Sequence, residues 1–140
     1  MPQISQTLIN AYLQTDYHVL GESPFVLKVG IASKPLMKLY KQTQTDCGVF
    51  ITAYNPYSRN VEASVNQEKQ AELVNELSQH SLVLIDGVGR HPQGGWPEEP
   101  SFFIPGLSLE ASKMLGKKYQ QNAVIWCGSN SIPELLLLMK

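Results

Sequence analysis

The sequence predicts an α+β domain whose core is ferredoxin-like, with helices on one face of an antiparallel sheet. Short runs rich in β-branched and aromatic residues alternate with longer segments of helical periodicity. From residue 47 onward the predicted order is strand, helix, strand, strand, helix, strand, strand. The first six of these elements match the β-α-β-β-α-β pattern of ferredoxin-like domains, and the seventh is expected to extend the sheet.

The first part of the chain is expected to extend this core. No internal repeat or linker is visible, so a single domain is predicted, with residues 1–45 as an N-terminal extension of the motif-bearing core, residues 46–140. Apolar residues at helical spacing between Ile4 and Tyr12 predict a short amphipathic helix. Two extended pieces and a turn should follow. Ser33, with a proline two positions later, is a plausible N-cap for a second short helix.

The core strands are predicted from their composition. Turn residues, such as Asn55–Pro56 and Pro105–Gly106, bound several of these runs and stop the strands. The expected strands are 47–54, 82–88, 101–104, 123–127 and 135–139.

Two longer helices should connect these strands. Ser64 and Gln67 form a capping-box pattern at the start of the first helix, in which each side chain bonds a backbone N–H of the other. Ser108 is expected to cap the second helix. Helical spacing predicts the buried faces, which are Leu73, Val74 and Leu77 in the first helix and Ala111, Met114, Leu115 and Tyr119 in the second.

Charge and composition argue against several classes of protein. The net charge is −1 and the basic residues are scattered, so neither nucleic acid nor an anionic membrane is expected as a partner. No apolar run approaches the ~20 residues of a membrane span. Because residues 1–12 also lack the apolar stretch of a signal peptide, the cytoplasm is the expected compartment. Cys47 and Cys127 are expected to be reduced, buried thiols, with a disulfide or metal site as the less favoured alternative.

The first of two polar loops, residues 53–59, joins a strand to a helix. Helix N-termini offer free N–H groups and a positive dipole, so ligands are often held at such a junction. Asn55 and Ser58 could hydrogen-bond a ligand, and Arg59 could clamp an anion with its planar guanidinium. Alternatively, Asn55 and Ser58 only form a turn and Arg59 is solvated.

Asn66, in the helix that follows, needs a separate explanation. It lies on one helical stripe with Gln70, Leu73 and Leu77, which is polar at one end and apolar at the other. A buried amide must find hydrogen-bond partners. Asn66 therefore either lines a polar pocket beside the first loop or lies in a first turn that protrudes from the core.

The second polar loop, residues 87–101, is rich in glycine and proline. Trp96 could stack against a ligand or anchor a partner, or it could fold back as a lid on the core, which is the commoner arrangement. Glu99, close to Ser101, could act as a general base or bind an amine. A structural ion pair between Arg59 and Glu99 is slightly preferred.

Other polar residues are weaker candidates. His91 is a lone loop histidine and is expected to be solvated. Gln121 and Asn122 precede a strand and could add amide groups to the same pocket. Residues 87–89 lack the third glycine of a dinucleotide fingerprint. No catalytic triad can be assembled and no ligand set has metal-binding spacing, so no cofactor and no metal are predicted.

These polar segments resemble a bacterial family known as domain of unknown function 3293. The similar segments, in matching order and spacing, are Thr52–Arg59, Asn66, Gly87–Gly106 and Gln121–Trp126. The resemblance runs from about Phe50 to Leu138. It implies a small bacterial protein and brings no catalytic residues with it. The resemblance would place an acidic residue at His91, and this departure weakens any mechanism that requires a carboxylate there.

Three functions are compatible with these residues. The preferred one is a binding module that recognises a small polar or anionic ligand, or a peptide, in a cleft between the 53–59 and 87–101 loops. The second is a hydrolase or nucleotide-processing enzyme that uses Glu99 or His91 as a base and Arg59 to stabilise charge. The third is a protein-interaction or assembly role, in which the run 135–139 pairs across a sheet edge.

Overall fold

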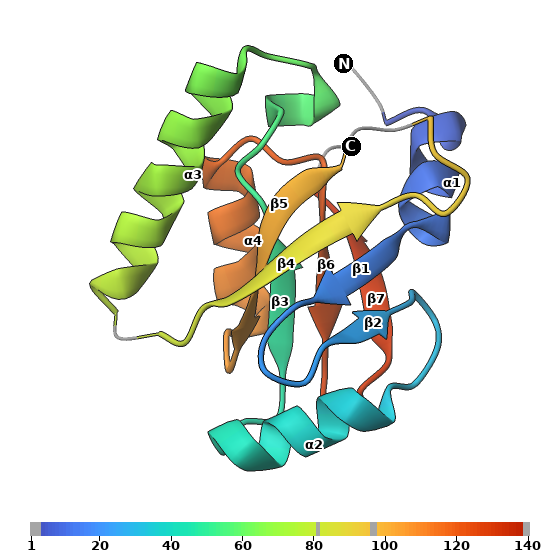
Figure 1. The fold of residues 1–140 in the computed structure, drawn as a ribbon, viewed down its shortest axis with the longest axis vertical. Coiled ribbons are helices and arrows are strands. Elements are labelled where there is room, and N and C mark those ends of the chain that lie inside the picture. Colours follow the sequence, from blue (N-terminus) through green and yellow to red (C-terminus); the bar gives the residue numbers. More distant parts are fainter. Residues whose placement is uncertain (1–3, 81, 96–97, 139–140) are drawn as a thin grey trace.

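The computed structural model describes residues 4–80, 82–95 and 98–138, with the backbone alone at Ser58. Its centre is a seven-stranded sheet of order β2-β1-β4-β5-β3-β6-β7, in which all neighbouring strands are antiparallel (Figure 1). The predicted α+β class is confirmed. The strands are β1 (Asp16–Val19), β2 (Phe25–Leu27), β3 (Gly48–Ile51), β4 (Ile85–Arg90), β5 (Glu99–Pro105), β6 (Ala123–Cys127) and β7 (Pro133–Leu137).

The helices begin largely where local sequence predicts. Ser33 accepts a hydrogen bond from the Leu36 N–H, and Ser108 accepts one from the Ala111 N–H, so both predicted N-caps are confirmed. A short 3₁₀ turn, η1, lies in the first polar loop. The bounds are α1 (Gln6–Gln14), α2 (Lys34–Thr43), η1 (Pro56–Ser58), α3 (Ala63–Ser78) and α4 (Leu109–Lys118).

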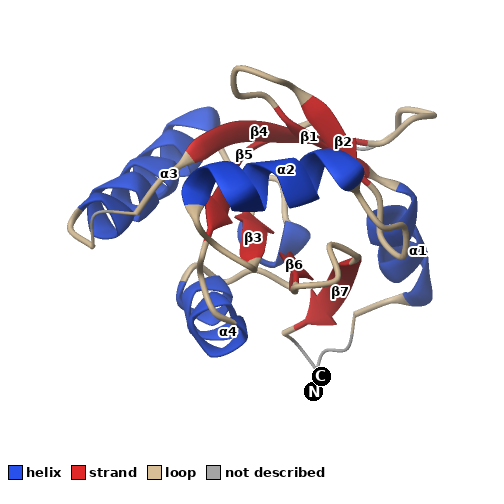
Figure 2. Cartoon of the chain, turned by 90° about the horizontal axis from the view of Figure 1, so that it is seen from below, coloured by secondary structure: helices blue, strands red, loops and turns tan. Residues whose placement is uncertain are grey.

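The two faces of the curled sheet are covered by different helices (Figure 2). The outer face packs against α3 and α4 and contains Val49, Ile51, Leu73, Leu77, Ile104, Leu115, Tyr119 and Val124. The inner face packs against α2 and contains Tyr17, Val19, Leu27, Leu36, Tyr40, Phe50, Phe103, Ile125 and Cys127. Because side chains alternate along each strand, neighbouring residues such as Val49 and Phe50 belong to opposite faces. Helix α1 lies toward the end of the molecule opposite α2 (Figure 1).

The capping box predicted at Ser64 and Gln67 is wrong. Helix α3 begins at Ala63, its N-cap is Glu62, and no side-chain cap hydrogen bond forms there. Ser64 is therefore inside the first turn and not at the N-cap. Only an N-cap side chain can accept the backbone N–H of the third helical residue, as a capping box requires. Both Ser64 and Gln67 are exposed.

The predicted buried face of α4 is partly wrong, since Met114 is 72% exposed. The buried positions include Ser112 and Gly116 together with Leu115 and Tyr119. A methyl group on Gly116 would overlap Leu138 and lie 2.9 Å from Val124 Cγ1, so the missing side chain lets the helix approach the sheet closely. The predicted strand 82–88 also shifts, because β4 runs from Ile85 to Arg90.

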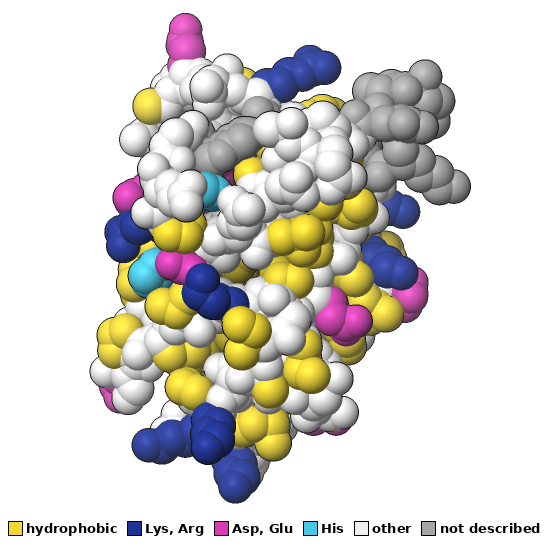
Figure 3. All heavy atoms as spheres, turned by 90° about the vertical axis from the view of Figure 1, so that its right-hand side faces the viewer, with side chains coloured by type: hydrophobic (Ala, Val, Ile, Leu, Met, Phe, Trp, Pro, Cys, Tyr) yellow, Lys and Arg dark blue, Asp and Glu magenta, His cyan; other side chains and the backbone are white. Residues whose placement is uncertain are grey.

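On the face shown in Figure 3, hydrophobic side chains lie scattered among polar ones, and basic side chains gather at the lower end, where α2 is located. Among the described residues, no helix has the length and apolar character needed to cross a membrane. Cys47 and Cys127 are both free thiols. Burial raises the pKa of Cys127 to about 12.

Candidate functional site

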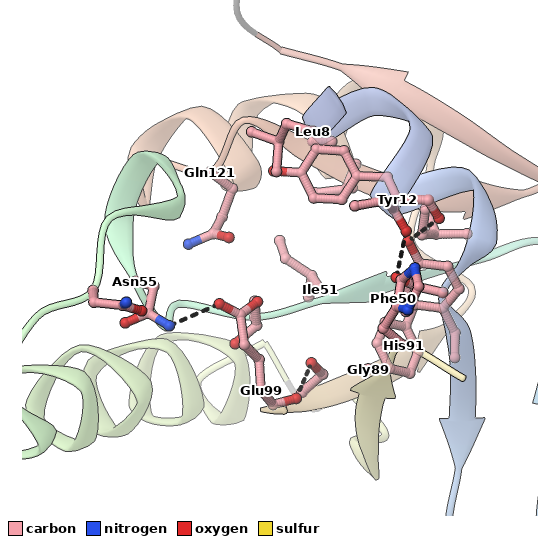
Figure 4. Close-up of a pocket in the computed structure, with 18 of the residues that line it drawn as sticks. Leu8, Tyr12, Phe50, Ile51, Asn55, Gly89, His91, Glu99 and Gln121 are labelled. Atoms are coloured by element: carbon pink, nitrogen blue, oxygen red, sulfur yellow. Dashed lines mark hydrogen bonds between the residues drawn. The ribbon is translucent and has the colours of Figure 1, made fainter. Parts of the chain in front are cut away.

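A cavity of about 310 Å³ lies between the sheet and helix α1 (Figure 4). This volume is at the lower end of the ~300–1,000 Å³ found for small-molecule sites. Leu8, Ala11 and Tyr12 of α1 form one wall, and Tyr17, Phe50 and Ile125 belong to the inner face of the sheet. The other described lining residues are Thr15, Ile51, Thr52, Asn55, Asn60, Gly89, His91, Gly95, Glu99, Ser101, Gln121, Ala123 and Val124.

Strand periodicity places Glu99 in this cavity. Glu99, Ser101 and Phe103 alternate along β5, and Phe103 is a fully buried residue of the inner face. Opposite them on β4, Gly89 pairs with Glu99 and Gly87 pairs with Ser101. The inner face thus changes along β5 from a hydrophobic core near α2 to a carboxylate near α1. The glycine opposite Glu99 leaves space above the strand.

The first polar loop begins at Asn55, which adopts a left-handed conformation with φ 48° and ψ 69°. Asparagine tolerates this region better than most residues. The conformation turns the chain from β3 towards η1 and α3. Tyr57, also with positive φ, donates its backbone N–H to the Gln120 carbonyl at 2.6 Å, which ties the loop to the end of α4.

Asn55 and Asn66 form a reciprocal pair of hydrogen bonds. Asn66 Oδ1 accepts from the Asn55 backbone N–H at 2.7 Å, and Asn66 Nδ2 donates to Asn55 Oδ1 at 2.9 Å. Their residues are 7% and 5% exposed. Of the two arrangements considered for Asn66, the structure has the buried one beside the loop. Both ends of its amide bond Asn55, and Asn66 is not among the described residues that line the cavity, so it positions Asn55.

Asn55 in turn holds Glu99. Its remaining amide group, Nδ2, donates to Glu99 Oε2 at 2.9 Å, so the two polar loops meet at this bond. Figure 4 shows the Glu99 carboxylate extending into the cavity toward Asn55. The result is a chain of three side chains, from Asn66 through Asn55 to Glu99, that fixes one carboxylate at the cavity wall.

A second set of hydrogen bonds keeps the two loops in register. Gln70 Oε1 accepts from the Ala53 N–H at 2.9 Å, while its Nε2 donates to the Pro100 carbonyl at 3.0 Å. Thr52 Oγ1 donates to the same carbonyl at 2.7 Å. The end of β3 is therefore attached to the start of β5 on the side of α3, which supports the position of Glu99.

Gln121 reaches the cavity from the other side (Figure 4). Its Nε2 donates to the carbonyls of Tyr54 and Tyr119, at 3.1 and 3.2 Å. Since both amide hydrogens are engaged, the group that Gln121 can offer a ligand is its carbonyl oxygen, an acceptor.

Glu99 dominates the electrostatics of the cavity. Among the described lining residues it is the one Asp, Glu, Lys or Arg. Burial raises its pKa above the ordinary value, and the hydrogen bond from Asn55 offsets part of this effect. His91 lies at the side of the cavity, where its Nδ1 accepts from the Gln93 N–H and its Nε2 lies 3.2 Å from Gln14 Oε1.

The structure brings together Asn55, Asn66, Glu99, Ser101 and Gln121 from the residues predicted by sequence. Arg59 is exposed and does not line the cavity. The preferred Arg59–Glu99 ion pair is wrong, because the carboxylate binds Asn55, and the neighbouring Glu98 pairs with Arg90 at 2.8 Å. Asn122 is buried before β6 and its carbonyl accepts from Leu138. Trp96 and the side chain of Ser58 lie outside the described residues.

Sequence reasoning did not assign the apolar wall to the site. Leu8, Ala11 and Tyr12 belong to the helical pattern that predicts a short amphipathic helix, and in the structure they line the cavity. A signal was available on β5, since alternation places Glu99 and Ser101 on the same face as Phe103. A carboxylate on a core-facing register position is uncommon and indicates a partner or a pocket.

This arrangement suits recognition of a small molecule. It offers a fixed carboxylate, an amide carbonyl and a hydrophobic wall within one cavity. The described part of the chain contains no group of three or more His, Cys, Asp or Glu side chains that could hold a metal ion. Polar groups at one side and hydrocarbon at the other are typical of pockets that orient an amphipathic ligand.

Comparison with known proteins identifies one family. A family model with the description "Protein of unknown function (DUF3293)" matches residues 51–124, just over half of the 140 residues. The matched segment includes Asn55, Asn66, Glu99 and Gln121, whereas α1 lies outside it. No curated protein and no solved structure matches the chain.

Proposed function

Because the chain belongs to the DUF3293 family, whose description assigns no activity, we propose from the cavity alone that it is a binding module for a small ligand. The ligand would place a polar group against Glu99 and an apolar body against α1. The observation that carries this proposal is the hydrogen-bonded chain Asn66–Asn55–Glu99, which holds a carboxylate in a cavity of about 310 Å³.

The free-energy cost of removing the Glu99 carboxylate from water supports a functional role for it. A carboxylate removed from water loses hydration, and a single neutral amide donor replaces only part of it. Groups that lower the stability of the folded protein are typical of binding and catalytic sites. The three linked side chains come from β5, the loop after β3, and α3, so the carboxylate is supported by separate elements.

The proposed ligand differs from the sequence hypothesis in one respect. The sequence hypothesis has Arg59 bind an anionic ligand, but Arg59 does not line the cavity, and the acidic or basic side chain among the described lining residues is that of Glu99. A polar ligand that donates hydrogen bonds fits the described lining better than an anion does.

The proposal is tested by a fragment screen with two-dimensional ¹H–¹⁵N NMR on the full chain. We expect the backbone amides of Tyr12, Gly89, Glu99 and Gln121 to shift together when a fragment binds. Gly89→Val, which fills the space opposite Glu99, should abolish these shifts while the rest of the spectrum is retained. Fragments that shift only residues outside the cavity, or no residues, would overturn the proposal.

An enzymatic role is the second candidate, and the raised pKa of Glu99 favours it. A carboxyl group with a raised pKa is better suited to exchange a proton with a substrate than one with an ordinary pKa. Glu99 would exchange the proton, and Arg59 would take no part because it does not line the cavity. Hydrolysis of p-nitrophenyl ester and phosphate panels, lost in Glu99→Gln and kept in Glu98→Gln, would support it. Equal rates in the two variants would contradict it.

We also propose that β3–α3–β4–β5–α4–β6 is a ferredoxin-like unit. The order β4-β5-β3-β6 with antiparallel neighbours supports this proposal, as does the position of α3 and α4 on one face of the sheet. In this view β7 extends one edge, while β1 and β2 extend the other. The cavity then lies where the N-terminal extension covers the unit. An experimental structure with a different strand order would contradict it.

A further inference from the structure

We infer that the polar group of the ligand is a protonated amine, bound by the carboxylate of Glu99 and packed against the aromatic side chains of the cavity. This inference rests on the proposed function and specifies its ligand class. It follows from the charge, hydrogen-bonding capacity and aromatic content of the lining.

The first argument is charge balance. No lysine or arginine is among the described residues that line the cavity, so the Glu99 carboxylate has no cationic partner there. The neighbouring Glu98 does have one, since Arg90 Nε lies 2.8 Å from its Oε2. A partly buried carboxylate is stabilised most by a positive charge within hydrogen-bonding distance. A cationic ligand supplies this charge, whereas an anionic ligand is repelled.

The second argument is hydrogen-bonding capacity. Within the described residues, Asn55 Nδ2 is the side-chain donor to the Glu99 carboxylate, and it engages Oε2. An ionised carboxylate can accept about four hydrogen bonds. Across the cavity, Gln121 has both amide hydrogens engaged and offers a carbonyl oxygen. Two acceptors that face one cavity select a ligand group rich in donors, and an ammonium group carries three.

The third argument is the aromatic lining. Tyr12, Tyr17 and Phe50 all contact the cavity, and the rings of Tyr17 and Phe50 meet edge to face with centroids 5.2 Å apart. Aromatic faces attract cations more strongly where water is excluded. Leu8 and Ile51 add hydrocarbon surface for the body of the ligand. An amine attached to a short apolar or aromatic group matches this combination.

The test uses three probes of similar shape, which are phenethylamine, 2-phenylethanol and phenylacetate. Their dissociation constants are measured by ¹H–¹⁵N NMR titration of the wild-type protein at pH 7. We expect the amine to bind at least about tenfold more tightly than the alcohol, because hydrogen bonds to charged groups contribute roughly 1.5–3 kcal/mol. Phenylacetate should bind most weakly.

Two variants locate the source of this preference. Glu99→Gln keeps an acceptor for Asn55 but removes the charge, so the amine and the alcohol should bind within about twofold of each other. Glu98→Gln, at the exposed neighbouring position, should keep the wild-type preference. The wild-type comparison of amine and alcohol remains informative even where a variant is poorly folded.

Several outcomes overturn the inference and leave the proposed function intact. These are equal binding of amine and alcohol to the wild-type cavity, an amine preference that survives in Glu99→Gln, and binding of other fragments to the cavity when phenethylamine does not bind. Failure of every screened fragment to shift cavity residues would instead overturn the proposed function, and the amine inference with it.

Discussion

The carboxamide of Asn55 donates a hydrogen bond to the carboxylate of Glu99 at 2.9 Å, across 44 positions in the sequence. This bond joins the loop after β3 to the first residue of β5. It also holds the Glu99 side chain at the cavity wall. Glu99 is the one Asp, Glu, Lys or Arg among the described residues that line the cavity. Since Asn66 holds Asn55 from the other side, the effect of altering either residue should be seen both in stability and in the cavity.

Asn66→Ala should destabilise the protein by about 1–3 kcal/mol. The change leaves the buried Asn55 N–H without its acceptor and removes the donor to Asn55 Oδ1. The higher helix propensity of alanine offsets a few tenths of this loss. Urea denaturation at pH 7 measures the difference. Gln67→Ala, at the exposed next position of α3, is the matched control and should be nearly neutral; equal losses in both variants would contradict the assigned role of Asn66.

Gly87 and Gly89 should respond differently to the same methyl group. A Cβ on Gly87 would lie 2.7 Å from the His18 carbonyl oxygen and 2.7 Å from the Phe50 ring, so Gly87→Ala should cost about 1–3 kcal/mol. The nearest neighbour of a Cβ on Gly89 would be Thr15 Cγ2, at an ordinary contact distance of 3.7 Å. Gly89→Ala should be neutral or stabilising by up to about 1 kcal/mol.

Thermal or urea unfolding of these two variants separates crowding from strand propensity. Both residues lie on β4 and both substitutions are glycine to alanine, so a propensity effect alone would be equal in the two. A similar loss in both variants would show that the space assigned to the cavity opposite Glu99 is filled in solution.

Glu99→Gln should raise the free energy of unfolding at neutral pH. The folded pKa of Glu99 is raised by burial, so its protonated form favours the folded state. That contribution is fully present below the ordinary carboxyl pKa of about 4.3 and is lost as the pH rises through the folded pKa. Glutamine avoids the loss, and the difference between the variant and the wild type should therefore grow from acidic to neutral pH.

Urea denaturation from pH 4 to pH 8 measures this difference. Among the described lining residues, the other titratable groups are Tyr12, Tyr17 and His91, and they are present in both proteins, so the difference isolates Glu99. A Glu99→Gln variant that is less stable than the wild type at pH 7 would show that the carboxylate is stabilised by a partner in the free protein. Glu98→Gln serves as the control at an exposed position.

The parts of the fold that sequence predicts are those set by local interactions. Ser33 and Ser108 cap their helices because a serine side chain and the N–H three residues later are neighbours in any such helix. The strand of Cys47–Tyr54 is recognisable from its β-branched and aromatic residues, although β3 itself is shorter. These predictions require no knowledge of what packs against each element.

The errors arise where distant residues decide the outcome. Helix α3 begins at Ala63 and not after a Ser64 cap, and its first turn is held by the Asn55–Asn66 hydrogen bonds, which local spacing does not reveal. Met114 points to solvent because Gly116 brings a different side of α4 against the sheet. Hydrophobic periodicity cannot predict such a contact, because it depends on the absence of a side chain at Gly116.

The candidate site shows the same division. Asn55, Glu99 and Gln121 could be selected from sequence because each lies next to the end of a predicted strand, where polar residues from different loops can meet. Their true partners could not, because Glu99 pairs with Asn55 and not with Arg59. Tyr12 is recognisable from sequence only as part of an amphipathic helix, since such a helix has the same pattern whether its apolar side covers a core or a cavity.

Glu76 should stabilise the contact between α3 and α4 above acidic pH. Its Oε1 accepts from Lys118 Nζ at 2.7 Å and from the Tyr119 hydroxyl at 2.8 Å. The hydrogen bond from Lys118 lowers the pKa of Glu76, and that from Tyr119 adds to the effect. A carboxyl with a lowered folded pKa contributes stability above its ordinary pKa of about 4.3, and this contribution is lost as the pH falls through the folded value.

Glu76→Gln should therefore lower the free energy of unfolding at pH 7 by no more than about 1 kcal/mol, since Lys118 is 60% exposed and water screens the pair. The deficit should shrink as the pH is lowered towards 3, because the wild-type carboxylate then becomes protonated. Glu72→Gln is the matched control one turn earlier, where the distance to Lys69 is 3.8 Å. A deficit that is independent of pH would mean that Glu76 stabilises the helix pair by packing and not by its charge.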